Sequence, residues 1–514
     1  LIEGLKDGAP FLDLLCKAHQ VGKAVVVLKV GKSERGAITT MAHTSRMAGS
    51  AEIYEAAFRQ FGVISTDTVE AFLGAAQMAA NQPPPQSGKL MVLTSTGAGA
   101  SLMADKAKEY GIELADISEE TRARIPSRRS AILANPFDTA GQSRSPRFLP
   151  TVCDAFASDL ANDCLLLLLG PLAVRHQYAV SFCEAVKRYR KAAAAIVSLT
   201  EEEMEEVFRQ HHIPLFDSST DACFRVLRGF IQYGQFCARQ QAGLRERDHP
   251  PQFRSSVDRM LNTCERFPMM PDSTTRELLG EYGLRTPSYA VASSYDVARE
   301  AAGKIRFPVI LKGITPNLAH KNEAGVVSRR ISDETELKRE YDSIHQKARA
   351  LAGGLEPVEV IVEKYIAHDY EVIIGVKYDA VFGPVVLFGL GGVFTEVLRD
   401  YSLRLAPLTT TEALDMLSDL KAFPVFERAA SQGVVDLNLL ADAIVKVSDL
   451  AVDLNGRMAA LDINPIALLS VPPGIMVLDA KIHLLCPGGD GRSLSAGDDP
   501  RAGDNVNNQL AFRR

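Results

Sequence analysis

The sequence predicts an α/β protein with two consecutive parallel-sheet units, followed by a C-terminal α+β domain. Between residues 23 and 233, short apolar runs alternate with Gly/Ser-rich turns and amphipathic stretches, which is typical of parallel sheets. These runs are apolar throughout, as expected for strands that are buried on both faces. After residue 271, helices are mixed with a longer series of strands. A chain of 514 residues also exceeds what one hydrophobic core supports, so several domains are expected.

The expected elements of the first region follow this alternation. Strands are predicted over 24–30, 63–65, 90–94, 131–134, 164–169 and 194–198, and helices over 50–60, 101–110, 181–190 and 201–210. Consecutive prolines at 83–85 cannot continue a helix or a central strand, so they mark a boundary. We therefore expect one unit over 1–82 and a second over 88–235.

A polar, highly charged segment separates the second unit from the C-terminal region. Residues 237–256 contain two consecutive prolines and no apolar period, so we expect a linker over 236–264. The tail over 487–514 is rich in Gly, Asp, Arg and Asn and is expected to be disordered. Between them, helices are predicted over 273–282 and 333–350, and strands over 309–312, 358–363, 370–376, 385–388 and 458–463.

Composition excludes several functional classes. The apolar (46%) and charged (23%) fractions are ordinary for globular proteins, which excludes collagen, coiled coil and wholesale disorder. The 57 Lys and Arg against 63 Asp and Glu give a net charge of −6 without a basic run, so neither nucleic acid nor an anionic membrane is expected as the main partner. We expect small-molecule partners and a homo-oligomer.

Cysteine usage and the longest apolar run bear on the location of the protein. The eight cysteines are scattered without a Cys-x-x-Cys pair, which favours a reducing, cytoplasmic setting over a disulfide framework or a zinc site. Gly170 and Pro171 interrupt the longest apolar run, which is shorter than the roughly 18 residues of a membrane-spanning helix. Because Leu1 stands inside what reads as a folded segment, we expect sequence to be missing before it.

Candidate phosphate-binding and catalytic residues lie at turns of the first region. Strand 90–94 leads through Gly97 and Gly99 into a helix, where backbone N–H groups can hold an anion or the glycines can serve only a tight turn. His43 lies in a small-residue loop before a helix, as a surface residue or a catalyst. Glu3 follows an apparent strand end, where α/β sheets bind ligands, although a charged loop residue reads the same.

The C-terminal region carries a second group of candidates. Lys312 ends a hydrophobic strand, where it can contact nucleotide phosphates or simply be solvated. Asp462 and Asn464 are two apart on a strand and are expected to share a face, which suits Mg²⁺ bound to phosphates or a polar strand end turning at Pro465. The nearby His320 favours the ligand-binding interpretation.

Taken together, and in the order in which they occur along the chain, these motifs resemble those of the NDP-forming acyl-CoA synthetases. This superfamily includes ADP-forming acetate–CoA ligase and succinyl-CoA synthetase. The resemblance covers residues 1–482. It implies two flavodoxin-like units followed by an ATP-grasp domain over 265–482, with ATP/ADP, Mg²⁺ and CoA as ligands. The motifs that carry it lie at 3–8, 30–34, 43–44, 48–50, 135–138, 311–312, 320–321, 388–396 and 462–465.

The resemblance also implies roles for individual residues. His43 would carry the phosphoryl group between sites, Glu3 would steady it, and His320 would be a second carrier. Lys312 would contact nucleotide phosphates. The remaining implied assignments are Glu363, Lys364, Tyr365 and Ile366 beside adenine, Glu371 in the nucleotide site, Gly97 and Gly99 at the phosphohistidine, Asp462 and Asn464 on Mg²⁺, and Asp479 as a further metal ligand.

The chemistry of acid activation explains why such residues recur. A carboxylate is a poor electrophile, so the acid must become an acyl phosphate before a thiol can attack it. Imidazole is nucleophilic near neutral pH and its phosphoramidate is high in energy, so a histidine can relay the phosphoryl group. Backbone N–H groups would stabilise that phosphohistidine. We therefore expect an ATP-dependent, ADP-forming acid–thiol ligase.

Some features depart from the family pattern and leave alternatives open. Ala42 and Ser45 flank His43-Thr44 where relatives have Ser and Gly, and residues 423–428 replace an Arg-Gly motif. The family's CoA-binding Rossmann domain is expected upstream of Leu1 or on a separate subunit. Alternatives are a lyase acting on an activated acid such as dimethylsulfoniopropionate, an ATP-grasp carboxylate–amine ligase that does not need His43, and an acyltransferase regulatory module. The motifs identify no particular acid.

Overall fold

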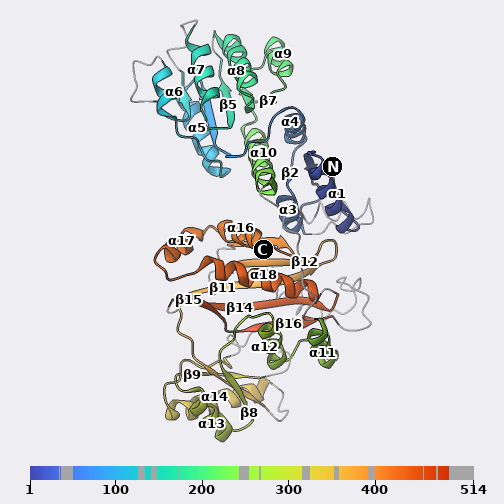
Figure 1. Ribbon diagram of the computed structural model, residues 1–514, viewed down its shortest axis with the longest axis vertical. Coiled ribbons are helices and arrows are strands. Elements are labelled where there is room, and N and C mark those ends of the chain that lie inside the picture. Colours follow the sequence, from blue (N-terminus) through green and yellow to red (C-terminus); the bar gives the residue numbers. More distant parts are fainter. Residues whose placement is uncertain are drawn as a thin grey trace. The chain divides into compact units, whose positions relative to one another are not determined.

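The computed structural model forms two compact units, Leu1–Glu246 and Arg247–Arg514 (Figure 1). The residues that it describes are 1–33, 35, 50–125, 133–139, 147–171, 173–241, 254–264, 268–314, 325–351, 358–391, 400–454, 456–470 and 473–485. Within these ranges, no helix is long and apolar enough to cross a membrane.

The first unit begins with a small parallel sheet. In it β1 (Val25–Leu28) pairs with β2 (Val63–Thr66). The Thr68 side chain accepts the Ala71 N–H at 3.1 Å, and this N-cap sets where the helix after β2 begins. The helices of this part are α1 (Ala9–Gln20), α3 (Ala51–Gln60) and α4 (Val69–Asn81).

A five-stranded parallel sheet forms the larger part of the first unit, in the order β4-β3-β5-β6-β7. Its strands are β3 (Leu90–Thr94), β4 (Phe137–Asp138), β5 (Cys164–Leu169), β6 (Ala192–Val197) and β7 (Leu215–Asp217). Its helices are α5 (Gly97–Glu109), α6 (Glu119–Arg124), α7 (Phe148–Ser158), α8 (Arg175–Tyr189), α9 (Glu202–Gln210) and α10 (Thr220–Gln241).

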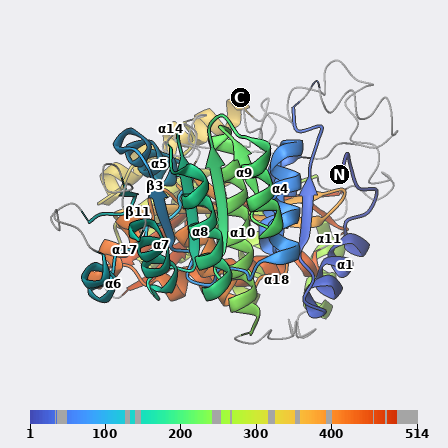
Figure 2. The same cartoon turned by 90° about the horizontal axis from the view of Figure 1, so that it is seen from above.

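Helices cover both faces of this sheet, which explains why its strands are apolar throughout. Helices α7, α8 and α9 share one core with the strands, and α5 and α10 share another. Figure 2 shows α7, α8 and α9 next to one another. This doubly covered arrangement is the one expected for a parallel sheet.

Helix α10 joins the two sheets of the first unit. Its Phe224 and Leu227 lie in the same core as Ile64 of β2. A Cβ on Gly234 of α10 would be 1.9 Å from the backbone oxygen of Pro85. The proline stretch that follows α4 is therefore packed tightly against α10.

The second unit contains two antiparallel sheets. The smaller has the order β8-β10-β9, and the larger has the path β13-β12-β11-β14-β15 with β16 paired to β14. Helices α11 (Arg254–Cys264) and α12 (Asp272–Glu281) share the core of the larger sheet. The elements of the smaller part are β8 (Tyr289–Ala292), α13 (Tyr295–Ile305), β9 (Val309–Gly313), α14 (Glu334–Leu351) and β10 (Val360–Lys364).

The larger sheet of the second unit packs against α18 and α16, and α18 runs along its face in Figure 1. The strands are β11 (Tyr370–Asp379), β12 (Gly383–Leu390), β13 (Tyr401–Leu405), β14 (Met458–Ser470), β15 (Pro473–Val477) and β16 (Ala480–Leu484). The helices are α16 (Thr410–Ser418), α17 (Phe423–Ser431) and α18 (Leu437–Asp453).

The predicted fold class, parallel sheets followed by an α+β domain, is confirmed, and the structure shows that the sheets of the α+β domain are antiparallel. Individual elements differ. Helix α5 begins at Gly97 rather than at residue 101, because Thr96 caps it. The strand expected over 131–134 is wrong at its described positions 133–134, and β4 follows at Phe137–Asp138 instead.

The linker expected over 236–264 is helical at both of its ends. Helix α10 continues to Gln241, and α11 occupies Arg254–Cys264. Val257, Leu261 and Cys264 of α11 are buried in the core of the second unit at helical spacing, a period that the surrounding charges hide in the sequence. The expected disordered tail lies outside the described residues.

Candidate functional site

Glu3 lies at the carboxyl end of the small sheet of the first unit. Ile2 forms a parallel bridge with Lys29, so Glu3 stands beside the end of β1. Lys29 is 2% exposed, and its Nζ donates to the backbone oxygens of Glu3 (2.9 Å) and Val30 (2.5 Å). Burial lowers the pKa of Lys29, and its Nζ lies 4.8 Å from the Tyr54 ring centre. Lys29 thus fixes the backbone at Glu3, a role that a strand-end lysine does not reveal in sequence.

Gly97 and Gly99 lie in the first turn of α5. Thr96, Gly97 and Ala98 are exposed, so this helix N-terminus is open to solvent, where N–H groups can meet an anion. Gly99 has a separate packing role: its N–H bonds to the Thr96 hydroxyl at 3.0 Å, and a Cβ here would be 2.8 Å from Leu168. The turn is therefore compatible with anion binding at its exposed N–H groups, and Gly99 also serves the tight packing of the turn.

The 135–138 motif contacts both strand β3 and the start of α5. The Asn135 amide donates to the backbone oxygens of Leu90 (2.7 Å) and Ala115 (3.0 Å), and its Oδ1 accepts the Val92 N–H. A Cβ on Gly97 would be 3.5 Å from Asp138 Oδ2. The Asp138 carboxylate interacts favourably with the helix N-terminus, so a phosphate bound there would have to compete with it.

Both candidate phosphoryl carriers, His43 and His320, lie outside the described residues. Their roles stay predictions from the sequence.

In the second unit, Lys312 connects the two sheets. Its Nζ donates to Glu363 Oε1 at 2.9 Å, on the neighbouring strand β10, and to the backbone oxygen of Leu478 at 2.6 Å. Leu478 precedes Asp479 in the turn between β15 and β16. Lys312 is 5% exposed and Glu363 is fully buried. The lysine that the sequence leaves open as solvated is therefore buried and paired.

Arg276 of α12 joins this cluster, and sequence reasoning missed it. Its Nη2 donates to Glu363 Oε2 at 2.6 Å, and its Nε donates to Asp272 Oδ1 at 2.9 Å. Its guanidinium lies 4.6 Å from the Tyr289 ring centre. An arginine on an amphipathic helix reads as solvent-exposed, and its partner Glu363 is 87 residues away in the chain, so no local signal identifies it.

The predicted metal ligands adjoin one another at β14 and the β15–β16 turn. Asp462 is paired in register with Lys481, and the Asn464 N–H donates to the Asp479 backbone oxygen at 3.1 Å. Asn464 and Pro465 form a bulge, since the register of β14 on β11 shifts there. Asn464 is exposed, and the other two are half-buried.

This donor set fits Mg²⁺. Two carboxylates and one amide oxygen are the hard oxygen ligands that this ion prefers. Across the described ranges, three His, Cys, Asp or Glu side chains nowhere gather into a ready-made metal site. Such an open arrangement suits an ion that keeps waters and binds through one or two carboxylates plus substrate phosphates. Lys481 Nζ lies 3.9 Å from Asp479 Oδ2, close enough to orient that carboxylate.

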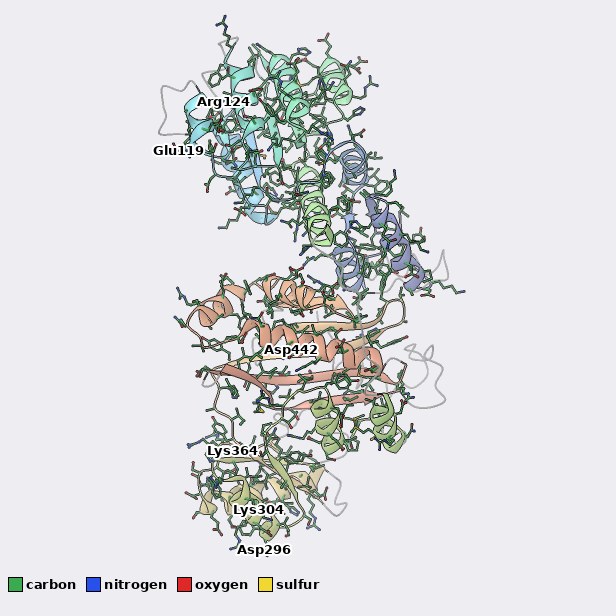
Figure 3. All side chains as sticks on the ribbon, viewed as in Figure 1. Glu119, Arg124, Asp296, Lys304, Lys364 and Asp442 are labelled. Carbon is green, nitrogen blue, oxygen red and sulfur yellow. The ribbon has the colours of Figure 1, made fainter. Side chains whose placement is uncertain are left out.

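Of the predicted adenine-side residues, Glu363 and Lys364 end β10, and Tyr365 and Ile366 follow it. Lys364 Nζ donates to the backbone oxygens of Arg306 (2.8 Å) and Phe307 (3.2 Å), so it fastens this strand end. In Figure 3, Lys364 lies on the side of the smaller sheet nearer the larger sheet, and Lys304 lies farther away. Tyr365 and Ile366 continue from it, partly exposed.

Glu371, predicted in the nucleotide site, is paired with a histidine that sequence reasoning missed. His368 Nε2 lies 2.7 Å from Glu371 Oε1, and His368 Nδ1 lies 2.9 Å from the Ile366 backbone oxygen. Gly391 donates its N–H to the Glu371 backbone oxygen, and a Cβ there would be 2.9 Å from Glu371 Cβ. The glycine is needed for this close approach.

Family models match both ends of the chain. The model of an ATP-grasp domain matches residues 265–484. The model of a succinyl-CoA ligase like flavodoxin domain matches residues 1–79.

Relatives cover most of the chain. An ADP-forming acetate–CoA ligase I of Archaeoglobus fulgidus is 29% identical over 485 residues, 94% of this chain and 69% of that protein. An ADP-forming 4-hydroxybutyrate–CoA ligase of Nitrosopumilus maritimus is 28% identical over 94% of this chain and 70% of its own length. The β subunit of an ADP-forming acetate–CoA ligase I of Pyrococcus furiosus is 38% identical over 221 residues, 43% of this chain and 94% of that subunit.

Proposed function

The chain belongs to the ADP-forming acyl-CoA synthetases, and we propose that it uses ATP and Mg²⁺ to activate a small carboxylic acid for transfer to the thiol of CoA. One observation supports this most directly. Lys312 Nζ contacts both Glu363 and the backbone next to Asp479, so the residues proposed for phosphate and for metal adjoin each other.

In the proposed mechanism the second unit binds the nucleotide. Lys312 contacts its phosphates as a compact cation, and the strand end at Lys364–Ile366 borders its base. Asp462, Asn464 and Asp479 would hold Mg²⁺, which when bound neutralises charge on the phosphate oxygens.

The phosphoryl group then passes through histidine. In a direct transfer, an imidazole nitrogen of His43 attacks the γ-phosphorus of ATP and releases ADP. In a relay, His320 attacks ATP and releases ADP, and His43 then attacks the phosphorus of phospho-His320 and frees the His320 imidazole. An oxygen of the acid attacks the phosphohistidine, which frees the imidazole and forms the acyl phosphate. The CoA thiolate attacks the acyl carbon and expels inorganic phosphate. Glu3, whose backbone is held by Lys29, would orient the His43 ring.

A panel of carboxylic acids tests this proposal. With ATP, Mg²⁺ and CoA present, the acid that is the substrate should stimulate release of ADP and phosphate, one of each per thioester formed. Release of AMP, or product formation that requires an amine in place of CoA, would exclude an ADP-forming acid–thiol ligase. The panel also identifies the acid.

A further inference from the structure

A buried series of charges connects α12 with the proposed phosphate-binding lysine. Glu363 is fully buried and carries a different cation on each carboxylate oxygen: Lys312 on Oε1 and Arg276 on Oε2. Arg276 is 6% exposed. Since water reaches none of the three freely, the charge of Glu363 must be balanced by these two cations.

Arg276 has two further contacts besides its ion pair with Glu363. Asp272 bonds its Nε, and the Tyr289 ring lies against the guanidinium. Its Nη1 is buried, with no hydrogen-bond partner among the described residues. A buried donor without a partner lowers stability, so a residue needed only for folding would be expected to have all of its donors paired. This points to a role in binding.

Lys312 is the residue that such a role would serve. Its ammonium has three donors, and Glu363 and the Leu478 oxygen take two of them. If Lys312 were the only cation on Glu363, the carboxylate would cancel its charge and hold it by both oxygens. With Arg276 present, two cations share one buried anion. Asp272, the remaining acid, is more exposed and its charge is better screened.

We propose that Arg276 is a positioning residue for nucleotide binding. It satisfies Glu363 from the Oε2 side, so that Lys312 keeps positive charge and one donor for the phosphates of ATP. The inference rests on the proposed function of Lys312, and it adds a residue outside the motifs that mark the nucleotide site.

The test is a second-site rescue in the full chain, with Mg²⁺-ATP binding measured by calorimetry. Arg276→Gln should weaken ATP binding about tenfold, which corresponds to about 1.4 kcal/mol, and raise KM more than it lowers kcat. Adding Glu363→Gln removes the carboxylate that competes with the phosphates of ATP for the Lys312 ammonium. The double variant should therefore bind ATP more tightly than Arg276→Gln alone. A double variant that binds no better, or an Arg276→Gln variant with unchanged affinity, overturns the proposal.

Two further variants separate this role from simple anchoring of α12. Tyr282 follows the last residue of α12, and its hydroxyl donates to Asp453. Tyr282→Phe removes this hydrogen bond and should leave ATP affinity unchanged. An equal loss of affinity in that variant would mean that only the docking of α12 matters. If Arg276→Gln folds poorly, Arg276→Lys keeps the charge and should stay close to the parent; a loss of affinity as large as that of Lys312→Ala would contradict the proposal.

Lys312→Ala distinguishes failure of this inference from failure of the proposed function. It should lose most ATP affinity, whereas Lys304→Ala, an exposed lysine paired with Glu300 on α13, should lose none. Unchanged binding in Lys312→Ala would remove the basis of both. Loss in Lys312→Ala without loss in Arg276→Gln would overturn the role of Arg276 alone.

Discussion

Three oxygen-bearing residues, Asp462, Asn464 and Asp479, stand at neighbouring backbone positions where β14 meets the β15–β16 turn, and their role is testable one residue at a time. Asp462→Ala or Asn464→Ala removes one oxygen ligand from a site that offers few, so the Mg²⁺ concentration for half-maximal activity should rise several-fold. A Mg²⁺ titration of ADP release measures this change. Asp442→Ala is the control, since Asp442 is an exposed partner of Lys446 on α18 (Figure 3). Unaltered titrations in both site variants would contradict the metal assignment.

His19 gives the first unit an acid-sensitive contact. Its ring meets Phe236 edge to face at 4.7 Å, and no described group pairs with its buried Nδ1. Burial lowers the pKa of His19 below its ordinary 6.5, so folding favours the neutral ring. The neutral ring therefore adds to the free energy of unfolding. This contribution is full above pH 6.5 and is lost as the pH falls from there through the folded-state pKa of His19.

We therefore expect His19→Phe to make the first unit less sensitive to acid. Phenylalanine keeps the edge-to-face contact but cannot take up a proton. Thermal unfolding between pH 7.5 and about 5 should show a smaller fall in Tm for the variant than for the parent. Equal pH dependence in the two proteins would show that His19 does not titrate as described.

At the scale of elements, α10 approaches the prolines after α4 closely at Gly234. Gly234→Ala would place a Cβ 1.9 Å from the Pro85 backbone oxygen, and backbone cannot move aside as a side chain can. We expect a loss of about 2 kcal/mol or more and faster amide hydrogen exchange in α10.

Gly303→Ala is the matched control for this prediction. Gly303 is also a helical glycine, in α13, and a Cβ there meets nothing within 4 Å. Its replacement should be neutral or stabilising by up to about 1 kcal/mol, because alanine favours the helix. If both variants exchange amides like the parent, the contact of α10 with the proline stretch is not as close as described.

The elements that sequence reasoning identified well are those whose pattern is local. Strands β3 and β5 have the predicted bounds, because a run buried on both faces is apolar at every position. Strands β13, β15 and β16 were missed, since an antiparallel strand with a partly exposed face shows only weak alternation over five residues. Helix α11 was missed because charges conceal its short apolar stripe.

In the candidate site too, sequence reasoning identified only the residues that a local pattern marks. Lys312 could be singled out because it stands near the end of an apolar strand, and Asp462 and Asn464 because they are polar residues that alternate with apolar ones. The strand end expected at Pro465 is wrong, since β14 continues to Ser470. Arg276, Lys29 and His368 could not, because their partners become neighbours only through folding. What a sequence motif omits here is the set of residues that hold the motif residues in place.

At the scale of the whole molecule, the proposed site residues are divided between the two units. Glu3 and the N-terminus of α5 belong to the first, and Lys312, Glu363 and the proposed metal ligands belong to the second. A reaction that takes a phosphoryl group from ATP in one unit and uses it in the other needs a carrier. A histidine that can be phosphorylated meets that need chemically.

The most direct test of this account follows the phosphoryl group itself. The chain is incubated with γ-labelled ATP and Mg²⁺, the labelled peptide is identified, and the label is then chased with the substrate acid. We predict an acid-labile, base-stable label on His43 that the acid discharges as acyl phosphate, and much less label in His43→Ala. Full labelling together with full activity in His43→Ala, or a label that the acid does not discharge, would contradict it.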